Sequence, residues 1–457
     1  MTSLGSTLAP GAFQPPSQQS ALELEDIQSG VLRPRPSPYA ATYIVLRIDD
    51  RQAGRELMGR LSNVVASAAH PESPARDTWV SAALSFQGLK ALGVPQASLD
   101  SFGPEFQQGM AARAAVLGDV GENSPENWEK PLGSADVHVV LTAISPDTEH
   151  LEAALARARA AYRELSGVTA LWRQDCHTPA DEREAFGFKD GISHPAIDGS
   201  GIPGSNPNER PLKAGEFVLG YPDEMAAAPA VPQPEVLGRN GTYIVFRKLH
   251  QRVAAFRQYL RANASHPEME ELIAAKMMGR WRSGAPLARS PMHDDPELGA
   301  DPRRNNDFQF KADDPIGYST PCGSHIRRLN PRDSDIAGVT RIHRMIRRGT
   351  SYGPLLPPGV LEDDGADRGL MFAFVGAHLW RQFEFVQSEW MNKGDFFGGG
   401  AAEDPICGLG KGDGTYDIPR RPLRLRLKGV PQFVVTRGGE YCFVPSLSAL
   451  RWLANPT

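Results

Sequence analysis

The stretch Thr42-Tyr43-Ile44-Val45-Leu46-Arg47 occurs twice in the chain, because it returns as Thr242-Tyr243-Ile244-Val245-Phe246-Arg247 with a single Leu/Phe difference. Both copies are rich in β-branched and aromatic residues, which favours a buried strand. A segment of helical composition follows each of them. We therefore predict an internal duplication, with two similar α+β units that each open on the same strand.

The segments that follow the first copy predict the order of elements in the first unit. We expect strands at residues 41–48, 79–84, 135–144 and 168–176, with helices at 51–67 and 147–165. This β-α-β-β-α-β order is that of a ferredoxin-like domain, with an antiparallel sheet and peripheral helices. Later strands are expected at 370–374 and 432–444, the second broken by a tight hairpin at Gly438-Gly439.

Shifts in composition divide the chain into four parts. Residues 1–21 are rich in Ser, Pro, Gly and Gln, which predicts a disordered tail. A first ferredoxin-like domain is expected over 22–200, and it carries a Gly-x-x-Asp-Gly motif. Dense proline and glycine over 201–238 predict a connection, and a second ferredoxin-like domain is expected over 239–457.

The overall composition limits the partners. The chain of 457 residues is 40% hydrophobic and has a formal net charge of -5, which fits a globular protein and argues against nucleic acid or an anionic membrane as partner. No uncharged apolar window is long enough to span a bilayer. Four cysteines without a Cys-x-x-Cys pair suit neither a disulfide framework nor a zinc site. Because no export signal is visible, we expect a cytoplasmic protein, with leaderless export left open.

One acidic side chain stands between two glycines in Gly187-Phe188-Lys189-Asp190-Gly191. Glycine adopts positive φ and lets the backbone approach a bulky partner, so this loop could aim the Asp190 carboxylate at a flat group. Asp-Gly is also a favoured turn dipeptide, so the motif alone fits an ordinary turn as well.

A histidine and several arginines form the next candidates. A neutral imidazole such as that of His325 can ligate a metal, including haem iron, and the neighbouring arginines could pair with haem propionates. A lone histidine among arginines is also common on a surface. The pair Arg347-Arg348 would be solvated or, if buried, a permanent cation. Leu370 and Phe372 by themselves indicate core packing.

Taken together, these segments resemble the dye-decolorizing peroxidases over about residues 22–453. The family's Gly-x-x-Asp-Gly motif is matched by Gly187 to Gly191, and its proximal histidine by His325 in Gly323-Ser324-His325-Ile326-Arg327-Arg328. The distal arginine is matched by Arg347, and the distal leucine and phenylalanine by Leu370 and Phe372.

The resemblance implies a haem peroxidase with two ferredoxin-like domains and one haem b per chain, held chiefly by the second domain. It implies that His325 ligates the iron and that Asp190 and Arg347 are the catalytic pair that cleaves hydrogen peroxide. The residues that the resemblance places against haem are Gly187, Gly191, Leu370, Phe372 and Arg327. The partners would be hydrogen peroxide and organic electron donors such as dyes and phenolics. The resemblance leaves the oligomeric state open.

Donors too large for the haem pocket would be oxidised by long-range electron transfer. Trp390 and Tyr352 match positions that serve as surface relays in some family members. Because a carboxylate stays charged down to a pH of about 4, a peroxidase with an aspartate base should favour acidic pH. Two other classes stay open, namely a haem-binding or iron-handling protein with incidental peroxidase activity, and a haem-free α+β structural protein.

Overall fold

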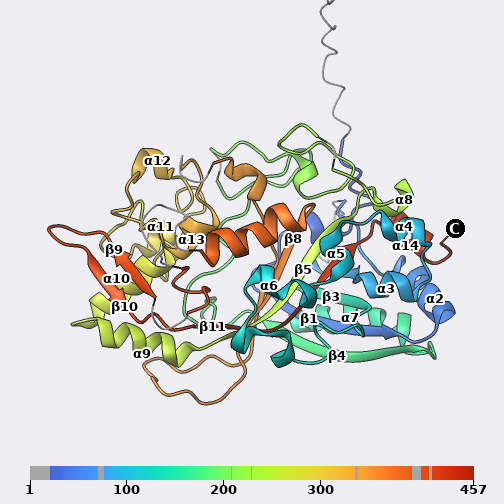
Figure 1. Ribbon diagram of the computed structural model, residues 1–457, viewed down its shortest axis with the longest axis horizontal. Coiled ribbons are helices and arrows are strands. Elements are labelled where there is room, and N and C mark those ends of the chain that lie inside the picture. Colours follow the sequence, from blue (N-terminus) through green and yellow to red (C-terminus); the bar gives the residue numbers. More distant parts are fainter. Residues whose placement is uncertain are drawn as a thin grey trace, which may run out of the picture.

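The computed structural model describes residues 21–69, 77–206, 208–227, 229–334, 338–393, 403–410 and 414–456. The predicted tail, apart from Ala21, lies outside the described residues. Figure 1 shows the N-terminal strands and helices gathered on one side of the molecule, and helices α9 to α13 with the β9–β10 hairpin on the other.

The first unit has the predicted order of elements. Its strands are β1 (Ala40–Ile48), β2 (Trp79–Leu84), β3 (Val139–Ser145) and β4 (Val168–His177), and its long helices are α2 (Arg51–Leu61) and α7 (Thr148–Tyr162). The strands lie in the order β4-β1-β3-β2, all antiparallel. The side chains of Asp50 and Asp147 cap α2 and α7 by accepting a backbone N–H in the first turn. The predicted βαββαβ unit is confirmed.

Helix α2 ends six residues before the predicted end of 51–67. Ser62 and Asn63 both donate side-chain hydrogen bonds to the carbonyl oxygen of Gly59, at 2.8 and 3.3 Å. Short polar side chains that bond to the backbone in this way compete with continuation of the helix. Helical composition alone did not reveal that stop.

The second unit repeats the strand order of the first. It contains β5 (Thr242–Gln251), β6 (Ile346–Arg347), β7 (Thr350–Tyr352), β8 (Gly369–Gly376) and β11 (Val434–Val444). The order β11-β5-β8-β6, with β7 also on β8, again places the fourth strand beside the first and the third beside the second. The two copies of the repeated hexapeptide, in β1 and β5, occupy corresponding positions, as a duplication requires.

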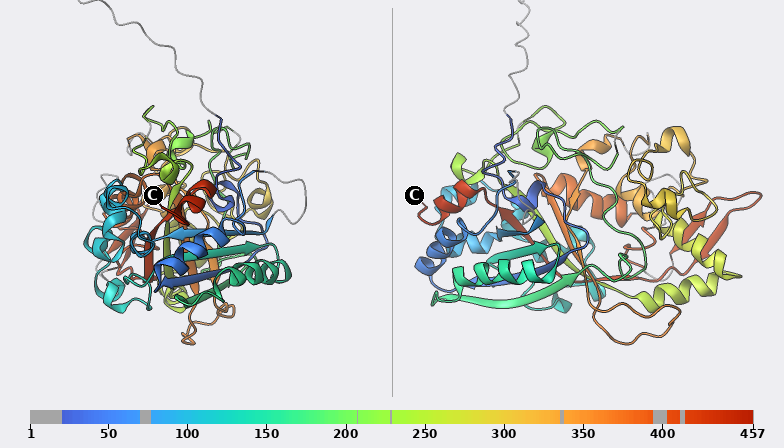
Figure 2. Two further views of the ribbon diagram at one scale, coloured as in Figure 1. Left: turned by 90° about the vertical axis from the view of Figure 1, so that its right-hand side faces the viewer. Right: turned by 180° about the vertical axis from the view of Figure 1, so that it is seen from behind.

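A single nine-stranded sheet joins the two units, because β2 pairs with β11 at Leu84 and Phe443. Helix α14 (Leu447–Leu453), at the end of the second unit, packs against α2 of the first. Figure 2 shows these two helices side by side at the edge of the molecule. One hydrophobic core therefore contains residues of both units, including Leu57, Leu61 and Leu450. The predicted domain limits stay a prediction.

Strand β11 corrects the predicted hairpin. It runs unbroken from Val434 to Val444 along β5, with a bulge between Thr436 and Gly438. The two glycines are needed for close packing: a Cβ on Gly438 would lie 2.5 Å from Leu132, and one on Gly439 would lie 2.5 Å from the sulfur of Met110. A Gly-Gly pair indicates either a turn or a close approach between segments, and in β11 it allows a close approach.

The remaining elements are short or peripheral. None of the helices in the described ranges is long and apolar enough to cross a membrane. The four cysteines are all free. The other helices and strands are α1 (Ser29–Leu32), α3 (Phe86–Ala91), α4 (Gln96–Asp100), α5 (Pro104–Gln108), α6 (Ala114–Leu117), α8 (Glu235–Gly238), α9 (Val253–Asn263), α10 (Pro267–Met278), α11 (Pro296–Ala300), α12 (Phe310–Asp313), α13 (His325–Leu329), β9 (Thr415–Ile418) and β10 (Leu425–Lys428).

Candidate active site

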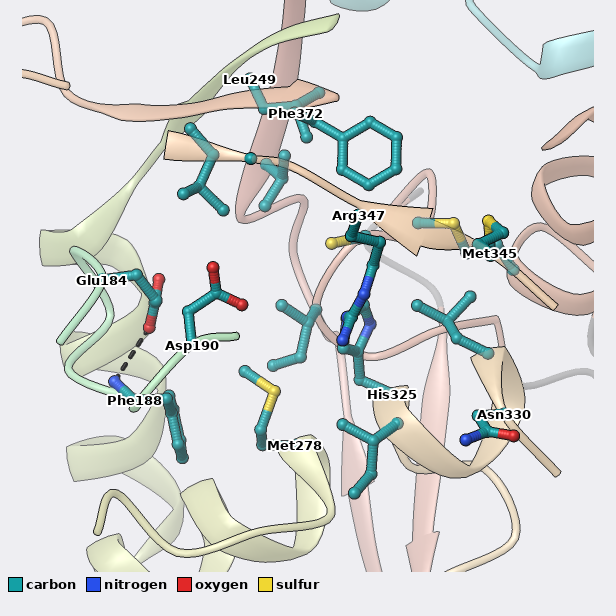
Figure 3. Close-up of a pocket in the computed structure, with 18 of the residues that line it drawn as sticks. Glu184, Phe188, Asp190, Leu249, Met278, His325, Asn330, Met345, Arg347 and Phe372 are labelled. Carbon is teal, nitrogen blue, oxygen red and sulfur yellow. Dashed lines mark hydrogen bonds between the residues drawn. The ribbon is translucent and has the colours of Figure 1, made fainter. Parts of the chain in front are cut away.

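A cavity of about 280 Å³ lies between the second unit's sheet and helices α10 and α13. Figure 3 shows the side chains of Arg347 and His325 extending toward one another in this cavity, with Asp190 beside them. The predicted site residues that line it are Asp190, Gly191, His325, Arg347, Leu370 and Phe372. Four other predicted residues, Gly187, Arg327, Trp390 and Tyr352, lie elsewhere.

The loop that carries Asp190 bends at two glycines, with φ of +94° at Gly187 and +77° at Gly191. A Cβ on Gly187 would lie 2.7 Å from the guanidinium of Arg282, so this glycine allows close packing below the loop rather than lining the cavity. The Asp190 carboxylate lies 3.6 Å from the guanidinium of Arg35, which belongs to the segment before β1. The cation beside Asp190 is thus Arg35, which the sequence did not reveal.

Three strands supply the wall opposite His325. Arg347 ends β6 and donates to the backbone oxygen of Ser193 at 3.2 Å, next to the Asp190 loop. Leu370 and Phe372 lie two residues apart on β8 and therefore face the same side of the sheet. Leu249 on β5 pairs with Leu370 and extends the apolar surface. Leu249, Leu370 and Phe372 form an apolar surface, and polar side chains stand around it: Arg347 and Asp190 at one edge, and Arg247 and Gln251 further along β5.

His325 begins α13, and its Nδ1 lies 2.9 Å from the Asp404 carboxylate. Because a carboxylate only accepts, Nδ1 carries the proton, which leaves the lone pair of Nε2 free for a metal. Burial alone would raise the pKa of Asp404, but the imidazole and the backbone N–H of Cys407 offset burial and hold this pKa below its usual value. Asp404 stands 79 residues after His325, so no local pattern pointed to it.

Arg327 was predicted to contact haem, but in the structure it is not among the residues that line the cavity. Arg327 is buried and donates to the Asp314 carboxylate at 3.2 Å and to the carbonyl of Thr320 at 2.8 Å. Its guanidinium lies 4.2 Å from the ring centroid of Phe310, which lines the cavity, so Arg327 stands one layer behind the wall. Two residues along a helix correspond to about 200°, which turns Arg327 away from the side of His325.

Arg332 and Arg280 line the cavity instead. Arg332 donates to the carbonyls of Asn306 and Phe308 at 2.9 and 2.8 Å, and no described carboxylate lies within ion-pair distance. Burial lowers the pKa of each of these two arginines to about 9. Neighbouring arginines add to the effect, while the carboxylates of Glu209, Asp333 and Asp307 oppose it at Arg332. Buried cations without an ion-pair partner are costly, so an anion bound on this side of the cavity would be stabilised.

The predicted surface relays are not at the surface. Trp390 and Tyr352 are each only 2% exposed. Trp390 packs against the rings of His343 and Phe385, and Tyr352 donates to the carbonyl of Leu249. Trp380, in the π-helical segment η8 (Leu379–Glu384), is 57% exposed, whereas Trp172 and Trp452 are half-buried.

The residues of this cavity fit a haem group. They offer an imidazole with a free Nε2, an apolar wall on the opposite side, and arginines without carboxylate partners that could receive propionates. Together with the doubled α+β fold, they are the features of a haem peroxidase pocket, with an aspartate, Asp190, among the lining residues.

Comparisons with known proteins agree with this class. The model of the DyP dimeric alpha+beta barrel domain matches residues 26–170. The chain is 32% identical over 425 residues to the dye-decolorizing peroxidase msp1 of Mycetinis scorodonius, covering 87% of this chain and 79% of that protein.

Solved structures extend the match to nearly the whole chain. A fungal DyP-type peroxidase from Auricularia auricula-judae matches with a TM-score of 0.81 and 28% identity, over 95% of this chain and all of that one. A dye-decolorizing peroxidase in complex with 2,6-dimethoxyphenol matches with the same TM-score, identity and coverage. The chain therefore belongs to the dye-decolorizing peroxidase family and is a peroxidase, as its motifs predicted.

Proposed function

We propose that this chain is a haem b peroxidase that reduces hydrogen peroxide and oxidises phenolic and dye donors. One observation carries the proposal: a single cavity brings Asp190 and Arg347 to one wall and the carboxylate-backed His325 to the other. The solved relative with bound 2,6-dimethoxyphenol supports a phenol as one class of donor.

Different residues of the chain would bind the iron and the propionates of haem. His325 would hold the iron through Nε2, with Asp404 fixing its orientation. Arg332 and Arg280 would pair with the propionates. Haem, when bound, supplies the redox chemistry, since peroxide oxidises it by two electrons and donors reduce it again.

Asp190 would move one proton between the two oxygens of hydrogen peroxide. Its carboxylate would accept a proton from the attacking oxygen and return it to the other oxygen, which leaves as water. Arg35, 3.6 Å away, would help to orient this carboxylate. Arg347 would stabilise the negative charge that develops as the O–O bond breaks. Over the full cycle one peroxide takes two electrons and two protons and becomes two waters.

The wall formed by Leu249, Leu370 and Phe372 would admit peroxide and small phenols. For dyes too large for the cavity, the exposed indole of Trp380 would be the place of electron transfer. Phe383, three residues further along η8, lines the cavity, and its ring centroid is 6.3 Å from that of Phe372. The predicted haem b type and cytoplasmic location stay predictions.

Replacement of Asp190 by Asn tests the proposal directly. This variant should keep its haem, because Asp190 is not among the residues expected to bind it, while the peroxide-driven change in haem absorption slows by about 100-fold or more. Stopped-flow mixing with hydrogen peroxide measures this rate. A variant as fast as the unmodified protein would refute the role of Asp190.

The His325→Ala variant tests the ligand. It should lose haem or shift the Soret band, since no other described histidine lines the cavity. An unchanged Soret band and haem stoichiometry would rule out His325 as the iron ligand.

A further inference from the structure

A buried glutamate stands at the base of the loop that carries Asp190. Glu184 is 8% exposed, and its two carboxylate oxygens accept the backbone N–H groups of Phe186 and Phe188 at 3.0 and 2.9 Å. Its own backbone closes the same turn, because the N–H of Glu184 donates to Phe188 and its carbonyl accepts from Gly187 at 2.7 Å. Figure 3 shows Glu184 and Asp190 on adjacent arms of this turn.

A third donor ties this carboxylate to the sheet. The side-chain amide of Gln251, at the end of β5, donates to Glu184 at 2.5 Å. β5 also contributes Leu249 to the cavity wall, so one strand carries both the wall and the anchor. The loop has a second attachment in Arg282, which donates to the carbonyl of Phe186 and whose own carbonyl accepts the N–H of Lys189 at 3.2 Å.

This arrangement fixes the path of residues 184–188 but leaves Asp190 itself free to face the cavity. Burial raises the pKa of Glu184, while Gln251 and the two amides partly offset that effect. Burying a carboxyl group costs free energy. Here the two carboxylate oxygens accept hydrogen bonds from two N–H groups that would otherwise be buried without partners. Asp190 lies two residues beyond Phe188, so the position at which this turn ends determines where the Asp190 side chain is placed.

We propose that Glu184 is a positioning residue for the peroxidase reaction, which holds the Asp190 carboxylate at the distance and angle that proton transfer requires. The inference rests on the role proposed above for Asp190. Glu184 also lines the cavity, but Phe186, Phe188 and Gln251 already engage both of its carboxylate oxygens, so we assign it no direct contact with peroxide. Its effect would be on the peroxide step alone, because the donor step does not use Asp190.

Glu440 provides a matched control. It is also 8% exposed, and it accepts the backbone N–H groups of Met110 and Tyr441 at 3.0 and 2.9 Å. It lies on β11 and does not line the cavity. A purely structural effect of losing a buried carboxylate should therefore appear in both Glu184→Ala and Glu440→Ala.

The experiment compares haem-loaded wild type, Glu184→Ala, Glu184→Gln and Glu440→Ala, and repeats Glu184→Ala in the Asp190→Asn background. Three quantities are measured: the second-order rate of the peroxide-driven absorption change, kcat/KM for a small phenol, and hydrogen exchange of the 184–191 amides by mass spectrometry. Glu184→Gln is the conservative variant, because its amide can keep the bond to Phe188 and can donate to the Oε1 of Gln251, which has no described partner.

We expect Glu184→Ala to slow the peroxide rate by about 10- to 100-fold, since small displacements of catalytic groups have effects of this size. The phenol kcat/KM should stay unchanged, and the amides of Phe186 and Phe188 should exchange faster. Glu184→Gln should regain most of the rate, and Glu440→Ala should leave it unaltered. In the Asp190→Asn background, Glu184→Ala should cause no further loss, because the two residues act through the same group.

Several results would overturn the inference: an unchanged peroxide rate in Glu184→Ala, an equal loss in Glu440→Ala, or a full additional loss in the Asp190→Asn background. If Glu184→Ala does not bind haem, Gln251→Leu replaces it, and an unchanged peroxide rate in that variant also overturns the inference. A fast Asp190→Asn variant would refute the proposed function, whereas a slow Asp190→Asn variant beside a fast Glu184→Ala variant would refute this inference alone.

Discussion

Glu440 gives the protein a stability that should depend on pH between weakly acidic and neutral conditions. This carboxyl group is buried on β11, no cation of the described residues forms an ion pair with it, and burial raises its pKa from 4.5 to about 7. The folded state therefore holds a proton that the unfolded chain releases at lower pH. Stability from this group is complete below pH 4.5, falls as the pH rises toward 7, and is constant beyond that.

The size of the effect follows from the same two values. At about 1.4 kcal/mol per pH unit, the interval from 4.5 to about 7 corresponds to roughly 3 kcal/mol of unfolding free energy. The Glu440→Gln variant cannot titrate, yet it keeps an oxygen for the N–H groups of Met110 and Tyr441. Relative to wild type, it should gain about 3 kcal/mol between pH 4.5 and pH 8.

Urea denaturation at a series of pH values, in samples with equal haem content, measures this difference. The two proteins should be closest in stability at pH 4.5, and the extra unfolding free energy of the variant should increase up to about pH 7. A difference that does not change with pH would refute the reasoning, because it would mean that Glu440 titrates alike in the folded and unfolded chain.

Three further predictions concern the haem site and the surface. Asp404→Asn should weaken the hold of His325 on haem by about 10- to 100-fold, measured as faster haem transfer to apomyoglobin; an unchanged transfer rate would contradict the pairing. Arg332→Leu should lower haem retention, read from the ratio of Soret to protein absorbance, whereas Arg327→Leu should lower thermal stability because it leaves Asp314 buried without its cation. Equal haem loss in both would contradict the assignment. Trp380→Phe should slow oxidation of a bulky dye several-fold while the peroxide rate stays the same, and a matched Trp390→Phe variant shows whether the buried indole also takes part.

The parts of the site that could be predicted from sequence are those carried by short motifs. Asp190 stands in a loop that its flanking glycines define, and Leu370 and Phe372 are fixed on one face by the two-residue period of a strand. The fold was predictable for a similar reason, because a repeated hexapeptide marks the first strand of each unit.

The site residues that could not be predicted lie far along the chain from the residues that they contact. Arg35, Asp404 and Gln251 reach the site from segments far from the residues they contact, and nothing in their local sequence marks them. Exposure is likewise a property of the folded surface. An indole at position 390 and one at position 380 look alike in the sequence, and packing alone distinguishes the buried one from the exposed one.

The junction between the two units also affects how the chain is made. Strand β11 and helix α14 are synthesised long after β2 and α2, yet they cover the edge of β2 and a face of α2. During translation the edge of β2 and the apolar face of α2 therefore stay exposed until β11 and α14 are made. Exposed strand edges of this kind can associate with other nascent chains. Synthesis of residues 434–453 is therefore the step that covers this edge and this face of the first unit.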